Sequence, residues 1–288
     1  MARRHREILD RIAVPPSSEA SLDERVHYLR PAALPGVEAL HASFVTHRYP
    51  AHVHESWTVA TVKRGAATFE LDGSRHVAPA GTTFVIPPGA VHTGEPATAD
   101  GYRYQVLYLS PVGGWETAEH SWPDRPHRTA MVVVRYPALF RSLTRAHAAL
   151  AAPAAALEQG EALASVISVL DAVVSGHEPT NEAYRPRAVS EAIDYIHAHL
   201  EEDFSLLDLA TAVGLSPHYM TRTFRDWVGT PPSSYRRALR VVAAQRLLRL
   251  GRPPAEVAAD CGFYDQSHLH RHFKAVSGVT PRQFALAS

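Results

Sequence analysis

The chain has 288 residues, of which 45% are hydrophobic and 20% are charged, and its formal net charge is zero. This length and composition predict a folded protein of two domains and exclude a wholly disordered chain. No apolar run reaches the roughly 18–20 residues of a membrane span, and charged residues occupy the N-terminal positions where a secretory signal is apolar. The single cysteine, Cys261, excludes an intramolecular disulfide. We therefore expect a cytoplasmic protein with no membrane partner.

Residues 1–40 are polar and contain four prolines, which predicts an irregular N-terminal arm. Residues 41–135 consist of short β-rich runs separated by turn residues, a pattern typical of a sandwich or a barrel. The predicted strands are Ser43–Tyr49, Trp57–Lys63, Ala67–Leu71, Thr82–Ile86 and Tyr102–Leu109.

Three histidines in the β-rich region have a recognisable spacing. His52 and His54 precede a predicted strand, and His92 follows Gly81 and the turn Pro87-Pro88-Gly89. This arrangement resembles the two motifs of the cupin family. The resemblance implies a small β-barrel with the three histidines inside it.

Two alternatives remain open for these histidines. Three histidines with a free fourth position bind Zn²⁺ or another divalent ion in many proteins. The carboxylate of the first cupin motif falls at Thr58 or Val59, neither of which is acidic, and this disfavours an iron oxygenase site. In the other alternative no cofactor binds, and polar and aromatic side chains line an effector pocket. The metal candidates are His52, His54 and His92, and the pocket candidates are these three with Trp57, Tyr102 and Tyr104.

Residues 136–176 have a helical pattern. Leu163, Ile167, Leu170 and Val174 recur at the spacing of one helix face. This apolar stripe either packs on the β-rich domain or pairs with a second copy in a homodimer. The polar stretch that follows contains two prolines and a glycine, so we place a linker at residues 177–187.

The C-terminal part of the chain, residues 188–288, is basic and repeats itself. From residue 205 onward it carries 11 Lys and Arg against 5 Asp and Glu, so the remainder carries 18 basic and 24 acidic residues. Nearly all of the positive charge is arginine, whose planar donor fork suits phosphates and guanine edges. Leu209, Ala210 and Gly214 are matched 48 residues later by Val257, Ala258 and Gly262, and after the turn the offset becomes 49. This duplication predicts two copies of one structural unit.

Each copy has the pattern of a helix-turn-helix. Ser205 and Asp208 form a capping box at the start of the first helix. Gly214 and Gly262 supply the turns, where a positive φ is needed, and Ser216 caps the helix that follows. A continuous helical pattern from Pro232 to Leu250 joins the copies. This stiff connector predicts two recognition helices that enter the major groove roughly 10 bp apart.

The stretch Gly262–Lys274, followed by Gly278-Val279-Thr280-Pro281, resembles the signature of the AraC/XylS family of bacterial transcription regulators. The resemblance covers about residues 187–288 and implies two helix-turn-helix units that read promoter DNA. It also implies a cupin-like N-terminal domain that senses a small molecule and controls dimerisation. From their positions on the recognition helices we expect DNA contacts from His218, Thr221, Arg222, Arg225, Gln266, Ser267, His268, His270, Arg271 and Lys274.

We therefore predict an α+β protein with a cupin-like β-barrel, packing helices and an all-α double helix-turn-helix domain. We expect it to act as a sequence-specific transcription regulator. Its expected partners are double-stranded promoter DNA and an unidentified small-molecule effector, with RNA polymerase and a second copy as further candidates. One alternative is a metal-dependent cupin enzyme with a DNA-binding tail, and another is a constitutive DNA-binding protein whose barrel only dimerises. The sequence contains no recognisable catalytic triad, so we expect no enzyme.

Overall fold

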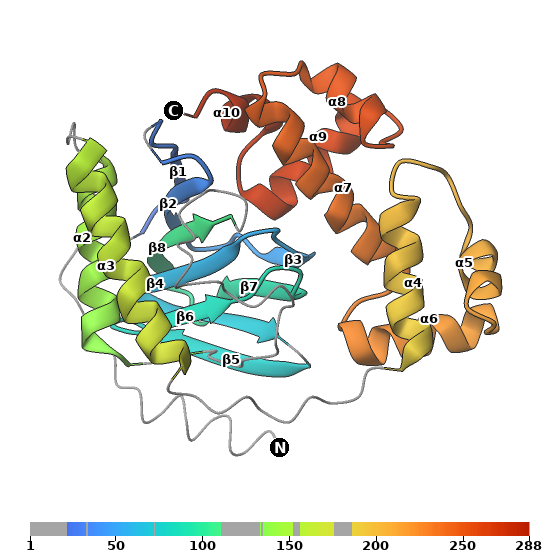
Figure 1. Ribbon diagram of the computed structural model, residues 1–288, viewed down its shortest axis with the longest axis horizontal. Coiled ribbons are helices and arrows are strands. Elements are labelled where there is room, and N and C mark those ends of the chain that lie inside the picture. Colours follow the sequence, from blue (N-terminus) through green and yellow to red (C-terminus); the bar gives the residue numbers. More distant parts are fainter. Residues whose placement is uncertain are drawn as a thin grey trace.

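The computed structural model describes residues 22–32, 34–71, 73–110, 133, 135–151, 156–175 and 186–287. In this part of the chain, a β-sheet domain with two helices precedes a domain built only from helices (Figure 1). The predicted class, α+β with a barrel-like sheet before an all-α double helix-turn-helix domain, is confirmed. No helix among the described residues combines the length and the apolar character that a membrane crossing requires.

The N-terminal domain is one antiparallel sheet that curls into a half-barrel. Its strands are β1 (Arg25–Leu29), β2 (Val37–Phe44), β3 (Tyr49–His52), β4 (Trp57–Leu71), β5 (Ser74–Pro79), β6 (Thr83–Ile86), β7 (His92–Pro96) and β8 (Tyr102–Leu109). The long strand β4 pairs with β6 and β8 along its first half and with β5 and β7 along its second half. It bends at Gly65, which has a positive φ and no room for a Cβ beside the Gly101 carbonyl oxygen.

The predicted strands agree with the structure in part. Trp57–Lys63 and Ala67–Leu71 are two halves of β4, and Thr82–Ile86 and Tyr102–Leu109 correspond to β6 and β8. The prediction of one strand at Ser43–Tyr49 is wrong, because β2 ends and the chain turns before β3 begins.

The described part of the predicted arm is also not irregular, because β1 and the start of β2 lie before residue 41. Both faces of β2 are buried. Ala39 belongs to a cluster on the outer face of the sheet, and Leu40 belongs to the cluster in the interior. A strand that is covered on both faces shows no alternation of apolar and polar residues, so the period-two pattern fails to reveal it.

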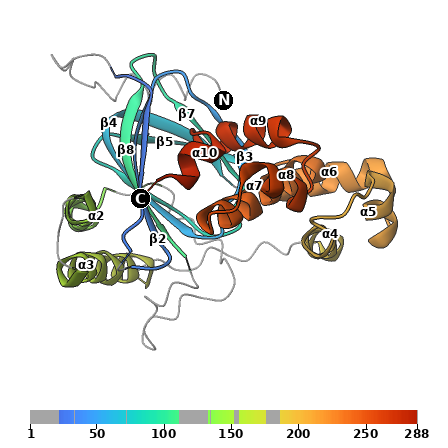
Figure 2. The same cartoon turned by 90° about the horizontal axis from the view of Figure 1, so that it is seen from above.

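Two helices cover the outer face of the sheet (Figure 2). Leu163, Ile167 and Leu170 of the predicted apolar stripe are buried in one cluster with residues of β4 and β8. The stripe therefore packs within the chain, and pairing of two copies stays a prediction. The side chain of Val174 lies outside the described residues. The two helices are α2 (Pro137–Ala151) and α3 (Ala156–Ser175).

A pair of histidines, one buried and one half-buried, lies between α2 and the sheet. The Nδ1 atom of His147 on α2 is 2.9 Å from Nε2 of His41 on β2. Gln105 of β8 lies 3.4 Å from the same His41 nitrogen, and Lys63 of β4 and His27 of β1 are further basic groups around the pair. Burial, followed by the charges of His41 and Lys63, lowers the pKa of His147 to about 3. The pair is therefore neutral near pH 7.

We expect His147 to make the fold sensitive to acid. Between pH 6.5 and about 3 the unfolded chain binds a proton at His147 that the folded chain does not bind. The free energy of unfolding should therefore fall with decreasing pH, by about 1.4 kcal/mol per pH unit from this one group. Urea unfolding at pH 7 and pH 4.5 measures the fall. The variant His147→Gln should show a smaller fall than the wild type, and an equal fall would contradict this assignment.

The C-terminal domain consists of helices α4 to α10. They are α4 (Arg187–Ala198), α5 (Leu206–Ala212), α6 (Pro217–Val228), α7 (Pro232–Arg249), α8 (Pro254–Asp260), α9 (Gln266–Ser277) and α10 (Pro281–Ala285). The linker predicted at residues 177–187 lies outside the described residues as far as residue 185, and α4 begins at its last residue.

The predicted local signals are confirmed in both helix-turn-helix units. Ser205 and Asp208 form the capping box of α5, and the Ser216 side chain accepts a hydrogen bond at the start of α6. Gly214 and Gly262 have φ values of 69° and 70°. The helix α7 is continuous and connects the two units, as the pattern predicts. The recognition helix α6 directly precedes α7, and the recognition helix α9 follows α7 after the short helix α8.

The second helix-turn-helix unit packs directly on the half-barrel (Figure 1). Phe273 of α9 and Phe284 of α10 belong to the same buried cluster as Tyr28 of β1. The Tyr28 hydroxyl donates a hydrogen bond to the Ser277 carbonyl at 3.2 Å. Val53 of the β-sheet domain packs in the cluster of the first unit. Both units therefore contact the β-sheet domain.

Candidate DNA interface and effector cavity

The helix α6 has one buried and one exposed face. Met220 and Phe224 are fully buried, whereas His218, Arg222 and Arg225 are exposed. Arg222 lies 3.9 Å from the Asp226 carboxylate in an exposed pair, which contributes little energy. The Arg222 guanidinium can therefore exchange this partner for DNA.

The remaining predicted residue of α6, Thr221, is half-buried, and its hydroxyl donates to the Pro217 carbonyl at 2.9 Å. This hydrogen bond occupies the hydroxyl proton within the helix. A side chain held in this way retains an acceptor oxygen and a methyl group for contact with a base.

The helix α9 repeats the arrangement of α6. Leu269 and Phe273 are fully buried. His268 is half-buried because its ring packs edge-on against Phe263 and its Nδ1 atom lies 3.3 Å from the Tyr264 amide. It therefore stabilises the start of α9, and its contact with DNA stays a prediction. The other predicted residues are all exposed, namely Gln266, Ser267, His270, Arg271 and Lys274.

Tyr264 was not among the predicted DNA contacts, although it lies within the family signature. Its side chain is 92% exposed, and it directly precedes Asp265, the N-cap of α9. A tyrosine that is this exposed beside a recognition helix is a further candidate for contact with the DNA backbone.

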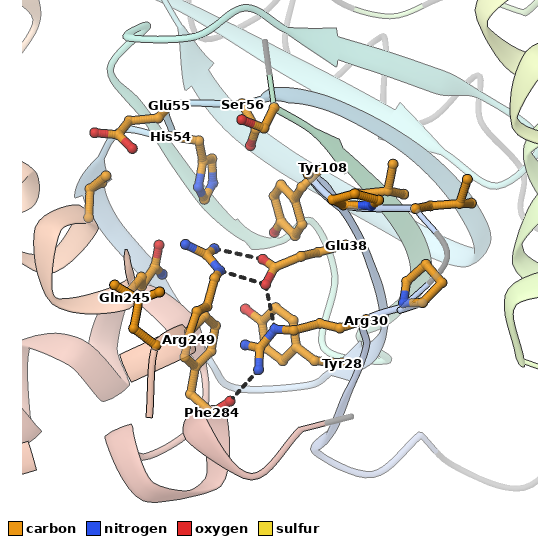
Figure 3. A pocket seen from close by; sticks show the side chains of 18 of the residues that line it. Tyr28, Arg30, Glu38, His54, Glu55, Ser56, Tyr108, Gln245, Arg249 and Phe284 are labelled. Carbon is orange, nitrogen blue, oxygen red and sulfur yellow. Dashed lines mark hydrogen bonds and ion pairs between the residues drawn. The ribbon is translucent and has the colours of Figure 1, made fainter. Parts of the chain in front are cut away.

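A cavity of about 560 Å³ lies between the two domains (Figure 3). Its walls come from the β-sheet domain and from α7 and α10. Near its centre the Glu38 carboxylate lies between two arginines (Figure 3). Arg249 of α7 donates two hydrogen bonds of 2.7 Å to Glu38, and Arg30 donates one of 2.5 Å. We call these three residues the Glu38 clasp.

The Glu38 clasp connects the domains electrostatically. Burial by itself raises the pKa of Glu38, but hydrogen bonds and charges from Arg249 and Arg30 outweigh burial and hold the pKa below its ordinary value. Glu38 is therefore ionised. Arg30 also donates to the carbonyls of Phe284 and Ala287, at 2.8 and 2.9 Å. The second Nη atom of Arg30 is buried and has no hydrogen-bond partner among the described residues.

The predicted histidines do come together. His52 and His92 are paired in the register of β3 and β7, and His54 follows two residues after His52. The ring centroids are 4.1 Å apart for His52 and His92, 5.0 Å for His52 and His54, and 5.2 Å for His54 and His92. We call these three residues the histidine cluster. They border a cavity of about 40 Å³ inside the half-barrel, which we call the histidine cavity.

The histidine cluster is held in a neutral state. Burial is the main cause that lowers the pKa of His52 and His54 well below the ordinary value, and burial lowers the pKa of His92 to about 4. Tyr102 and Tyr104 line the same cavity, where the Tyr104 hydroxyl lies 3.3 Å from the Tyr49 hydroxyl.

The placement of Trp57 in this pocket is wrong. Side chains alternate along β4, so Thr58 faces the histidine cavity, whereas Trp57 packs in the cluster beneath α2 and α3. Trp57 begins the stretch Trp-Thr-Val-Ala-Thr-Val, in which apolar and polar residues do not alternate strictly, so the sequence does not show which face of the strand is inward.

The interdomain cavity and the histidine cavity share a wall. His54 and Tyr108 line both of them, and their rings are 5.0 Å apart. The positive charge of Arg249 also contributes to the low pKa of His54. The interdomain cavity was not predicted, because its residues come from both ends of the chain.

Two stretches of the chain match known families. Residues 34–167 match the AraC-like ligand binding domain, and residues 209–286 match a helix-turn-helix domain. The chain belongs to the AraC family of transcription regulators. The expected regulator is thereby confirmed and is favoured over a cupin enzyme with a DNA-binding tail.

This AraC-family regulator is similar to the arabinose operon regulatory protein of Escherichia coli K12, with 29% identity over 77% of each chain. It is also similar to the uncharacterized HTH-type transcriptional regulator YbfI of Bacillus subtilis, with 23% identity over 81% of this chain and 86% of that protein. A solved apo structure of ToxT from Vibrio cholerae, in a variant with one lysine replaced by alanine, aligns with a TM-score of 0.53 and 9% identity. The alignment covers 88% of this chain and 97% of ToxT, which shows a common fold.

Proposed function

We propose that this regulator binds promoter DNA through α6 and α9 and takes its effector in the interdomain cavity. The observation that carries the proposal is the cavity itself, because both domains build it and its volume of about 560 Å³ lies in the range of small-molecule sites. The histidine cavity, which holds most of the predicted pocket residues, is far smaller at about 40 Å³.

The walls of the interdomain cavity favour an amphipathic effector with an acidic group. Leu34, Val242 and Phe284 supply apolar surface. Arg30 has a buried donor with no partner among the described residues, and this donor needs an acceptor. Solved structures of ToxT with an unsaturated fatty acid and with an arylbutenoic acid, at TM-scores of 0.53 and 0.51, support carboxylic acids as the class to test first.

Effector binding would act on DNA recognition through α7. This helix contributes Val242 and Arg249 to the cavity and joins the two helix-turn-helix units. An acid that pairs with Arg249 competes with Glu38 and so changes how α7 is held against the sheet. The effector can change DNA affinity by no more than the difference between its own affinities for two arrangements, one with the Glu38 clasp closed and one with it open.

A screen of monocarboxylic acids from butyrate to oleate tests the proposal. At least one acid should raise the melting temperature and change the affinity for a DNA site selected by the wild type at least fivefold. Decanol serves as the uncharged counterpart of decanoate and should bind more weakly. If no acid binds, the acidic class is wrong.

The variant Leu34→Trp locates the site. The indole should fill part of the interdomain cavity and weaken binding of the active acid at least tenfold, as measured by calorimetry. Leu157→Trp, on an exposed position of α3, is the matched control and should bind like the wild type. Equal binding by both variants would exclude this cavity as the effector site.

We further propose that the regulator acts in the cytoplasm and has no enzymatic activity. Its relatives are transcription regulators, which supports both statements. Contact with RNA polymerase and pairing of two copies stay predictions.

A further inference from the structure

We propose that the histidine cluster binds a divalent transition-metal ion such as Zn²⁺. One ligand nitrogen from each of His52, His54 and His92 lies within 4.8 Å of the other two. Tetrahedral zinc with bonds of about 2.0–2.1 Å needs ligand nitrogens about 3.4 Å apart. The three side chains therefore require a shift of about an ångström to surround one ion.

Hydrogen bonds to the backbone orient two of the three imidazoles. His52 donates from Nδ1 to the Pro50 carbonyl at 2.7 Å, and His92 donates from Nδ1 to the Ala90 carbonyl at 3.0 Å. A proton on Nδ1 leaves Nε2 with its lone pair, which is the form that a metal requires. Ligating histidines commonly donate their other nitrogen to a carbonyl in this way.

The size of the histidine cavity selects an ion over an organic ligand. A volume of about 40 Å³ holds a few atoms, whereas sites for organic ligands span roughly 300–1,000 Å³. Thr58 lines this cavity, and its hydroxyl is buried and has no hydrogen-bond partner among the described residues. A buried hydroxyl in that state indicates that the cavity holds a polar species.

The donor set also defines the kind of ion. Three neutral imidazoles suit zinc, copper, nickel and ferrous iron, whereas calcium and magnesium prefer oxygen ligands. Within the part of the chain that the structure describes, no carboxylate joins the histidine cluster, so a bound divalent ion keeps its full charge and favours an anion at its free position. His54 lines the interdomain cavity as well, and the ion therefore lies beside the proposed effector.

The test uses cobalt as a spectroscopic probe for the proposed site. Full-length protein is treated with EDTA, dialysed and titrated with Co²⁺ alone. The wild type should bind one equivalent and develop the visible absorption bands of four-coordinate Co²⁺, and Zn²⁺ should displace it. His52→Gln and His92→Gln should each weaken binding at least 100-fold.

The control variant is His27→Gln, which removes a histidine of β1 outside the cluster and should bind Co²⁺ like the wild type. Melting curves with and without Zn²⁺ provide a second readout that does not depend on the variants, and the wild type should melt at a higher temperature with Zn²⁺. No absorption bands in the wild type at saturating Co²⁺, or equal bands in His92→Gln, would overturn the assignment. The titration needs neither effector nor DNA, so its result is independent of the effector cavity.

Discussion

Replacing Arg222 and Arg271 together by alanine is expected to weaken DNA binding about 30-fold or more. The two arginines occupy equivalent positions on α6 and α9, and both are exposed. A good arginine contact to a base edge is worth about 1–3 kcal/mol, and about 1.4 kcal/mol is a factor of ten in affinity. The loss should be measured by fluorescence anisotropy on a site selected by the wild type from random DNA. If the arginines contact phosphates instead, the slope of the logarithm of the binding constant against the logarithm of the salt concentration should become shallower. The expected change is about one for each lost contact.

The matched control is Arg187→Ala at the start of α4. Arg187 is exposed, lies 2.6 Å from Glu191, and belongs to α4 rather than to either recognition helix. Its loss should change affinity less than twofold. Circular dichroism should show that all variants are folded. A folded double variant that keeps the affinity of the wild type would contradict the assignment of α6 and α9 as the DNA-reading helices.

The C-terminal domain could be predicted because its signals are local and occur twice. Caps, turn glycines and the first-turn proline each act within a few residues, so Ser205, Gly214 and Ser216 reveal helix ends without knowledge of the fold. Because the pattern occurs twice, the second copy independently supports the helix-turn-helix that the first copy predicts. The exposed faces of α6 and α9 follow from the helical period alone.

The β-sheet domain was harder to predict for a physical reason. Strands buried on both faces, such as β2, lose the alternation that identifies them, and Trp57 shows that the inward face of β4 cannot be read from sequence. The Glu38 clasp joins Arg30 to Arg249 across more than 200 residues of chain. No spacing rule connects such residues, so the interdomain cavity becomes visible only in the folded molecule.

Replacing Glu38 by glutamine is expected to lower the free energy of unfolding by about 2–3 kcal/mol. The substitution keeps the size of the side chain but leaves Arg30 and Arg249 without their counter-charge. Breaking a buried ion pair by removing one partner costs about 3–5 kcal/mol, and the 37% exposure of the Arg249 side chain reduces that cost. Urea unfolding measures the loss. Hydrogen exchange at the amides of α10 should rise as well, because Arg30 then holds the carbonyls of Phe284 and Ala287 less firmly.

The chain offers a matched control in Glu95→Gln. Glu95 also pairs with two arginines, but Arg48 and Arg75 have side chains that are 72% and 48% exposed. Surface pairs of this kind contribute about 1 kcal/mol or less, so Glu95→Gln should lower the free energy of unfolding by no more than that. Only Glu38→Gln should increase exchange in α10, because Glu38, unlike Glu95, connects the two domains. Equal losses in the two variants, with unchanged exchange in α10, would show that the Glu38 clasp does not hold the second helix-turn-helix unit on the half-barrel.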